Sequence, residues 1–314
     1  MLLRRIIALM LVAVTALAQS EDIFRRLRKA LSSNGSGELA SAALANHDYA
    51  RVEQMLVELK PATQSERAEN LSLRGAIEFL DGKMNAAVRD FQNASKVTPL
   101  NDTDSFTFAM ALVNLGDESD ARPLLTALAE KYPKQAIYIY WLGRLDYGQR
   151  RYVEAVAKLT RASELDSESA RVWDSLGLAF DMQGRMDRAL EAFQKAVNLN
   201  RASAQPSPWP PHDLGFLLLR MDHAKEAEAS LREALRYDPH LGQTHYHLGR
   251  VLEKEGLDTE AVEEYRSAIS ADVASTDACY SLAMLYRKLH RDAEASAMFA
   301  EYKKRKQDTA TTPN

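Results

Sequence analysis

The chain has 314 residues, of which 46% are hydrophobic and 27% are charged, a composition that supports a folded core and excludes a disordered chain. Its formal net charge of −4 argues against nucleic acid as a partner, because phosphates reward a basic surface. The single cysteine, Cys279, excludes an internal disulfide, so packing alone must stabilise the fold.

Residues 1–18 have the pattern of a signal peptide. Arg4 and Arg5 precede an apolar run that begins at Ile6 and ends in the small-x-small sequence Ala16-Leu17-Ala18. The run is shorter than the roughly 20 residues of a membrane-spanning helix, although an uncleaved anchor or a buried helix remains an alternative. We expect cleavage after Ala18, and a mature chain without stable membrane insertion that is periplasmic or secreted.

Residues 19–33 are expected to form an amphipathic helix that caps the structure that follows. Ile23, Phe24, Leu27 and Leu31 would form its apolar face. Residues 34–67, which include His47-Asp48-Tyr49, look like a degenerate copy of the repeat described next.

From residue 68 onward the sequence repeats. Seven alanines are separated by 34, 34, 34, 38, 34 and 34 residues, and they are Ala87, Ala121, Ala155, Ala189, Ala227, Ala261 and Ala295. A small residue stands twelve positions before each alanine and a bulky apolar residue four positions after it, as Gly177 and Phe193 do around Ala189. This spacing predicts pairs of antiparallel helices that cross closely. Because each pair buries only part of its apolar surface, the pairs should stack.

The pattern resembles that of tetratricopeptide repeats. The best copy is residues 170–203, where the family order is followed by Trp173, Leu176, Gly177, Phe180, Gly184, Ala189, Phe193 and Ala196. The resemblance implies an all-α fold, a right-handed helical solenoid of helical hairpins. Its seven repeats would span 68–101, 102–135, 136–169, 170–203, 208–241, 242–275 and 276–309, with a polar tail at 310–314.

Prolines interrupt the repeat at two places. Pro123 falls within the second helix of its copy, so we expect that helix to start late or to bend. The four-residue insert 204–207 coincides with a proline-rich stretch, which should keep Trp209 and Pro210 extended and delay the next helix to about Pro211, roughly one turn short. Trp209 would then pack over the gap or, alternatively, form the lip of a binding groove.

In the resembled family the first helix of each repeat lines a concave face. Carried over position by position, this implies a ligand-binding groove formed by Phe106, Tyr140, Arg144, Tyr147, Trp209, His212, Phe216, Tyr246, Arg250, Tyr280 and Arg287. The aromatic rings would supply contact area and the arginines would bind carboxylates, which suits an extended peptide. Two alternatives remain: the same rings could bind a cell-wall glycan or another polysaccharide, or they could simply pack between neighbouring first helices.

The remaining polar residues do not indicate a metal site or a catalytic site. His245 and His247 are two residues apart on an expected helix and point about 200° apart, so they cannot share a metal. The chain contains no phosphate-binding glycine loop or nucleophile motif, and the repeats leave no room for a catalytic domain. We therefore predict a non-enzymatic scaffold, without cofactor or metal, whose partner is a protein or peptide.

Overall fold

The computed structural model describes residues 12–32, 35–271 and 276–311. Within these ranges the chain forms helices and no strands, which confirms the all-α hairpin-repeat fold class. Of the predicted signal peptide, residues 1–11 lie outside the described residues and residues 12–18 belong to the first described helix. No helix in the described ranges is both long enough and apolar enough to span a membrane.

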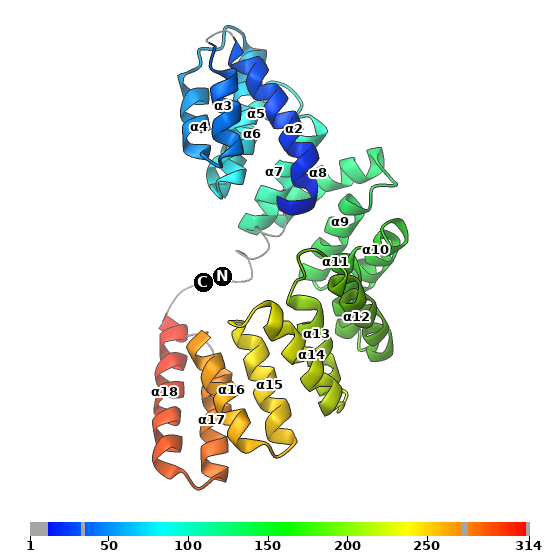
Figure 1. The fold of residues 1–314 in the computed structure, drawn as a ribbon. Coiled ribbons are helices and arrows are strands. Elements are labelled where there is room, and N and C mark those ends of the chain that lie inside the picture. The colour runs from blue at the N-terminus through cyan, green and yellow to red at the C-terminus, as the bar shows by residue number, and fades with distance from the viewer. Residues whose placement is uncertain (1–11, 33–34, 272–275, 312–314) are drawn as a thin grey trace. The chain divides into compact units, whose positions relative to one another are not determined.

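The helices divide into two compact units, residues 1–145 and residues 146–314 (Figure 1). The first unit contains α2 (Val12–Ala30), α3 (Gly37–Ala45), α4 (Tyr49–Glu58), α5 (Gln64–Leu80), α6 (Met84–Ser95), α7 (Asp102–Leu115), α8 (Glu118–Lys131) and most of α9 (Ala136–Gly148). The second contains α10 (Tyr152–Leu165), α11 (Ala170–Met182), α12 (Met186–Arg201), α13 (Trp209–Arg220), α14 (Ala224–Tyr237), α15 (Gly242–Lys254), α16 (Asp258–Ala271), α17 (Thr276–Lys288) and α18 (Asp292–Thr311).

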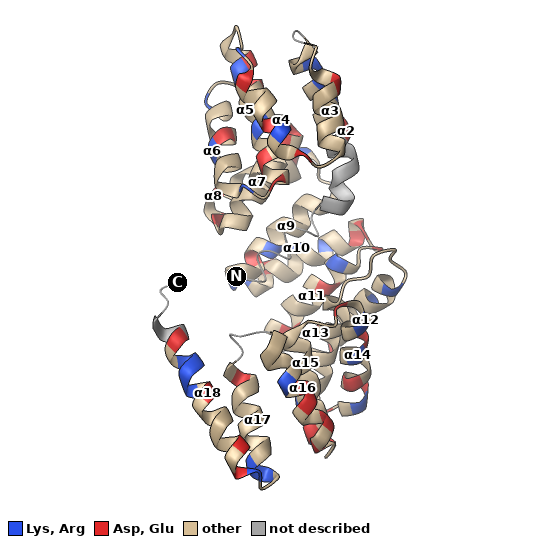
Figure 2. Ribbon diagram, turned by 60° about the vertical axis from the view of Figure 1, so that its left-hand side comes forward, with Lys and Arg blue, Asp and Glu red and all other residues tan. Residues whose placement is uncertain are grey.

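Consecutive helices form hairpins, and the hairpins stack. In the second unit α11 packs on α12, α13 on α14, α15 on α16 and α17 on α18. The first helices of successive hairpins also touch, so α11, α13 and α15 lie side by side (Figures 1 and 2). In the first unit α5 and α7 are neighbours in the same way.

The close crossing inside each hairpin lies at the predicted pair of small and bulky residues. A Cβ atom added at Gly177 would lie 2.6 Å from the ring of Phe193, and one at Gly249 would lie 2.7 Å from the ring of Tyr265. Each bulky residue comes from the second helix of the same hairpin, sixteen residues later. Because these contacts leave no space for even a methyl group, the prediction of a backbone approach is confirmed.

The turn between the two helices of a hairpin contains one residue with a positive φ, in the left-handed region. Glycine supplies it at Gly82, Gly116, Gly184 and Gly256, five residues before the repeated alanine. At the same place in other copies stand Arg150, Asp222 and His290, with φ values of 58°, 69° and 57°. A side chain in this region is strained, so these three turns are less favourable than the glycine turns.

The first helix of the hairpin formed by α5 and α6 extends ahead of the repeat copy that was placed at 68–101. Helix α5 starts at Gln64, where Thr63 and Glu66 form a capping box. The amide of Glu66 donates to Thr63 Oγ1 (3.1 Å), and the amide of Thr63 donates to Glu66 Oε2 (3.2 Å). These two bonds satisfy amide groups that a helix start otherwise leaves without acceptors.

The prediction that α13 would begin at Pro211 is wrong. The helix begins at Trp209, and Pro208 before it already has helical dihedral angles (φ −72°, ψ −17°). The first amides of a helix have no acceptor within it, so Pro210 and Pro211 cost no hydrogen bond there. Helix α13 has 12 residues against 13 in α11, so it is one residue short rather than one turn.

For the helix that contains Pro123, a late start or a bend was expected, and the late start is wrong. Helix α8 begins at Glu118, five residues before Pro123, which lies inside it. Proline removes one amide donor from the helix, and the packing of Ala121 and Leu125, both fully buried, on this hairpin stabilises the helix in spite of that loss.

A side chain that was not among the predicted residues holds the insert 204–207 in place. Asn200 is buried near the end of α12 and forms two hydrogen bonds of 2.8 Å with the backbone of Ser207. Its Nδ2 donates to the carbonyl of Ser207, and its Oδ1 accepts from the amide of Ser207. The insert is therefore an ordered connection into α13.

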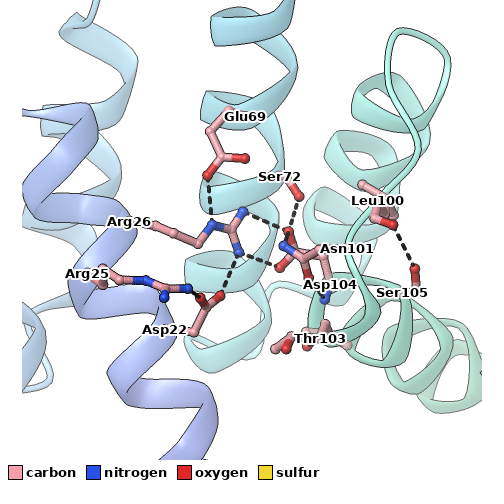
Figure 3. Close-up of polar contacts among 11 residues, drawn as sticks. Asp22, Arg25, Arg26, Glu69, Ser72, Leu100, Asn101, Thr103, Asp104 and Ser105 are labelled. Carbon is pink, nitrogen blue, oxygen red and sulfur yellow. Dashed lines mark hydrogen bonds and ion pairs between the residues drawn. The ribbon is translucent and has the colours of Figure 1, made fainter. Parts of the chain in front are cut away.

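Helix α2 binds the first helices of its own unit (Figure 3). Ile23, Leu27 and Leu31 are buried, and the guanidinium of Arg26 lies between α5 and α7. Arg26 donates to Glu69 Oε1 (2.7 Å) and to both carboxylate oxygens of Asp104 (2.9 and 2.7 Å). The amphipathic N-terminal helix therefore covers the face of α5 and α7 where a ligand of this unit was expected.

Candidate functional site

The predicted groove residues differ widely in exposure. Phe106, Tyr140 and His212 are buried, with 4%, 2% and 4% of their surface exposed. Arg144, Tyr147, Trp209, Phe216 and Tyr246 are half-buried, whereas Arg250, Tyr280 and Arg287 are exposed. Eleven positions carried over from a family pattern thus do not form one uniform surface.

Two of the buried members, Phe106 and His212, pack between neighbouring first helices. The fifth residue of one copy contacts the residue 32 positions later, in the next first helix. Such pairs are Ser72 with Asp104, Phe106 with Tyr138, and His212 with Thr244. Phe106 and His212 therefore pack between neighbouring first helices, because helices that lie side by side enclose the side chains between them.

A pocket of about 490 Å³ opens on the first helices of the second unit. Four predicted residues, Tyr147, His212, Phe216 and Tyr246, line it. The other lining residues are Leu178, Asp181, Met182, Phe193, Asp213, Gln243, His247, Thr276 and Asp277. Trp209, Arg250, Tyr280 and Arg287 are not among them, and Phe106, Tyr140 and Arg144 belong to the first unit.

The charged residues that line the pocket are all acidic: Asp181 on α11, Asp213 on α13 and Asp277 on α17. The arginines expected to bind carboxylates lie elsewhere. Arg220 Nη1 donates to Asp181 Oδ1 (2.7 Å), and its guanidinium carbon lies 5.7 Å from the centre of the Phe216 ring. Arg250 lies 5.9 Å from the ring of Tyr246.

Two histidines, His212 and His247, line the pocket. His212 Nδ1 shares a hydrogen bond of 2.8 Å with Thr244 Oγ1, and the ring of His247 lies 5.5 Å from that of His212 and 4.5 Å from that of Phe216. Burial lowers the pKa of His212 to about 4. Burial, His212 and Arg250 together lower the pKa of His247 to about 3. Both rings are therefore neutral at pH 7.

The third histidine of this region behaves differently. His245 Nδ1 lies 2.6 Å from Glu264 Oε2, and its Nε2 lies 2.9 Å from the carbonyl oxygen of Pro239. The hydrogen bond with Glu264 raises the pKa of His245. Over the described parts of the chain, no three His, Cys, Asp or Glu side chains are grouped so that they could share a metal ion.

Six polar residues of the pocket were not among the predicted site residues, namely Asp181, Asp213, Gln243, His247, Thr276 and Asp277. Most of the predicted residues occupy positions 5 and 9 of their copies, whereas these six occupy positions 12, 6, 2, 6, 1 and 2. The pocket runs obliquely across the helices, so the lining position moves by about one turn from α11 to α13 and again to α15 and α17. A search along that diagonal would have found them.

The chain resembles known repeat proteins. The sequence model described as tetratricopeptide repeat matches residues 106–170, 142–207 and 212–278. Superkiller complex protein 3 of Mus musculus is 30% identical over 183 residues, which are 55% of this chain but only 12% of that protein.

Two solved structures share the fold. The hetero-tetramer Cut9–Hcn1 of the APC/C is 17% identical with a TM-score of 0.65, over 90% of this chain and 59% of that chain. A tetratricopeptide repeat protein from Parabacteroides merdae is 16% identical with a TM-score of 0.63, over 83% of this chain and 99% of the other.

Proposed function

Because the chain belongs to the tetratricopeptide repeat family, whose members generally serve as protein-interaction scaffolds, we propose that it is a non-enzymatic scaffold that binds a peptide segment of a partner protein in the pocket of its second unit. The observation that carries the proposal is the pocket itself, which opens across α11, α13, α15 and α17. A hollow that crosses several parallel helices offers successive contacts to an extended chain.

The first unit favours the same assignment. Its first-helix face is covered by α2, whose Arg26 bridges Glu69 on α5 and Asp104 on α7 (Figure 3). A peptide would have to displace the buried Arg26–Asp104 ion pair before it could bind there. The second unit offers a pocket of about 490 Å³ on its first helices.

Peptide binding is favoured over the glycan alternative by the placement of the rings. A sugar stacks on an exposed aromatic face, but Phe106 and Tyr140 are buried, and the ring of His247 lies 4.5 Å from that of Phe216. The pocket combines aromatic rings with carboxylates and an amide, a mixture typical of peptide recognition.

We further propose that residues 1–18 export the protein and that the scaffold acts in the periplasm or outside the cell. The apolar run after Arg4 and Arg5 supports this location.

The test of peptide binding uses a photo-crosslinking residue at Gln243, which is exposed at the pocket, in the purified mature protein. A random peptide library is incubated and irradiated, and the attached peptides are sequenced. We expect enrichment at Gln243 but not at Val153, which is exposed on α10 outside the pocket. Equal labelling at both positions, or pelleting of the protein with peptidoglycan that a Tyr246→Ala substitution abolishes, would overturn the proposal.

A further inference from the structure

We propose that the pocket of the second unit selects an arginine side chain, so that the partner's segment is basic. The inference rests on the proposed function, because it names the chemistry of the segment that the pocket binds. It replaces the expectation of a ligand carboxylate, which depended on arginines that do not line the pocket.

The charges in the pocket favour a cation. Asp181, Asp213 and Asp277 are all the charged residues that line it, and they come from three different helices. Arg220 pairs with Asp181 from outside, whereas Asp277 makes no ion pair with a described residue. A cation among carboxylates in a partly desolvated hollow gains more than it would in water, and an acidic segment is repelled.

One imidazole nitrogen at the pocket offers a further contact to a cation. His212 is 4% exposed and makes its one hydrogen bond within the described residues through Nδ1, while Nε2 lies 4.0 Å from Asp213 Oδ1, beyond hydrogen-bond distance. In the tautomer whose Nδ1 donates to Thr244 Oγ1, Nε2 is an acceptor, and a ligand that donates to it satisfies an otherwise unpartnered polar atom.

A guanidinium matches this set of groups. It carries five N–H donors and no acceptor, so it can donate to carboxylate oxygens and to His212 Nε2 together. The rings of the pocket already accept such a group on one side, since Arg220 lies over Phe216 and Arg250 lies over Tyr246. Arginine is favoured over lysine, because a planar cation stacks on a ring while its edge donates to carboxylates.

The test measures fluorescence anisotropy of the mature protein with labelled heptapeptides of the sequence Gly-Ser-Arg-Gly-Arg-Ser-Gly. Matched peptides carry citrulline, lysine or glutamate in place of both arginines. We expect the citrulline peptide, which is neutral but similar in shape, to bind at least tenfold more weakly than the arginine peptide. We expect lysine to be intermediate and glutamate not to bind.

Variants place the interaction in the pocket. Asp277→Asn should weaken binding of the arginine peptide about fivefold, and Asp213→Asn with Asp277→Asn about tenfold or more. Asp187→Asn removes the same charge from an exposed position of α12 outside the pocket and should change affinity less than twofold. Asp277 is exposed, so its single variant remains informative if the double variant does not fold.

Equal binding of the arginine and citrulline peptides would overturn the inference. So would an equal loss for Asp187→Asn and Asp277→Asn, since that result shows attraction by net charge only. Library peptides that crosslink at Gln243 but lack arginine would refute this inference and leave the proposed function intact. No enrichment at Gln243 would refute the proposed function itself.

Discussion

Gly177 lies where α11 and α12 approach most closely. Alanine is the better helix former by about 1 kcal/mol, but its Cβ would lie 2.6 Å from the Phe193 ring, and overpacking of this kind costs about 1–3 kcal/mol. We expect Gly177→Ala to lower the free energy of unfolding by up to about 2 kcal/mol in urea titrations. Gly75→Ala is the matched control, because its Cβ would meet Phe91 at 3.2 Å, and it should cost less. A larger loss at Gly75 would contradict the crossing argument.

His290 occupies the left-handed position of its hairpin turn, with φ at 57°. Glycine adopts this conformation without steric cost, whereas other residues pay about 1 kcal/mol. We therefore expect His290→Gly to raise the free energy of unfolding by about 1 kcal/mol. Gly256→Ala, in the equivalent turn of the preceding hairpin, should lower it by a similar amount. Urea midpoints that move in the same direction for both variants would exclude turn strain as the cause.

His212 should make the protein sensitive to acid. Its pKa is lowered by burial from 6.5 to about 4, so the unfolded chain takes up this proton first as the pH falls. The stabilisation is complete above about pH 6.5 and is lost toward pH 4, and His212 alone should cost about 2 kcal/mol between pH 7 and pH 5.

The check compares urea unfolding at pH 7 and pH 5. His212→Gln cannot titrate and can still bond to Thr244, so the difference between the two pH values should shrink by about 2 kcal/mol. His290→Gln, at an exposed position, should leave the difference as it is in the natural protein. An unchanged difference in His212→Gln would show that this ring is not the cause.

At the scale of elements, Arg26 attaches α2 to α5 and α7. Both the guanidinium and the carboxylate of Asp104 are buried, and removal of one partner from such a pair costs about 3–5 kcal/mol. We expect Arg26→Ala to abolish the slow hydrogen exchange of α2 and to destabilise the first unit by about that amount. Arg25→Ala is the neighbouring control: its side chain is 79% exposed, and its pair with Asp22 should contribute less than about 1 kcal/mol. Retained protection of α2 in Arg26→Ala would show that apolar packing alone holds the helix.

The hairpins could be predicted because the close crossing of their two helices restricts which residues can stand at the crossing. A position such as Gly177, Gly215 or Gly249 accepts only a small residue, and the same requirement returns with every copy. The start of α13 could not be predicted from the prolines, because two of their effects oppose each other. The residue before a proline avoids helical dihedral angles, but a proline in the first turn of a helix loses no hydrogen bond. The packing of Pro210, Pro211 and Leu214, all buried, decided between them.

The candidate site was predictable only in part, for a geometric reason that appears at the scale of a whole unit. A periodic sequence aligns equivalent positions, but a pocket that runs obliquely over α11, α13, α15 and α17 takes a different position from each copy. Tyr246 and Phe216 were predicted because they occupy positions 5 and 9 of their copies, from which most of the groove residues were chosen. Asp181 and Asp277 were missed because they occupy positions 12 and 2, and the repeat pattern does not single them out.

The export proposal makes the last prediction, which concerns the mature chain as a whole. Cleavage after Ala18 would leave Asp22, Ile23, Arg26 and Leu27 in α2, so the shortened helix keeps its buried contacts with the first unit. We therefore expect protein extracted from its native cell to begin at Gln19 by intact mass and to appear in the periplasmic or secreted fraction.

Ala18→Asp should block cleavage, because the site requires a small uncharged residue, and should leave a longer chain in the membrane fraction. Ser20→Asp changes a residue outside the small-x-small sequence and serves as the control that should still be cleaved. A chain that begins at Met1 and remains in the cytosol would overturn the export proposal. The peptide pocket would be unaffected by that result, because every residue that lines it lies beyond Asp146.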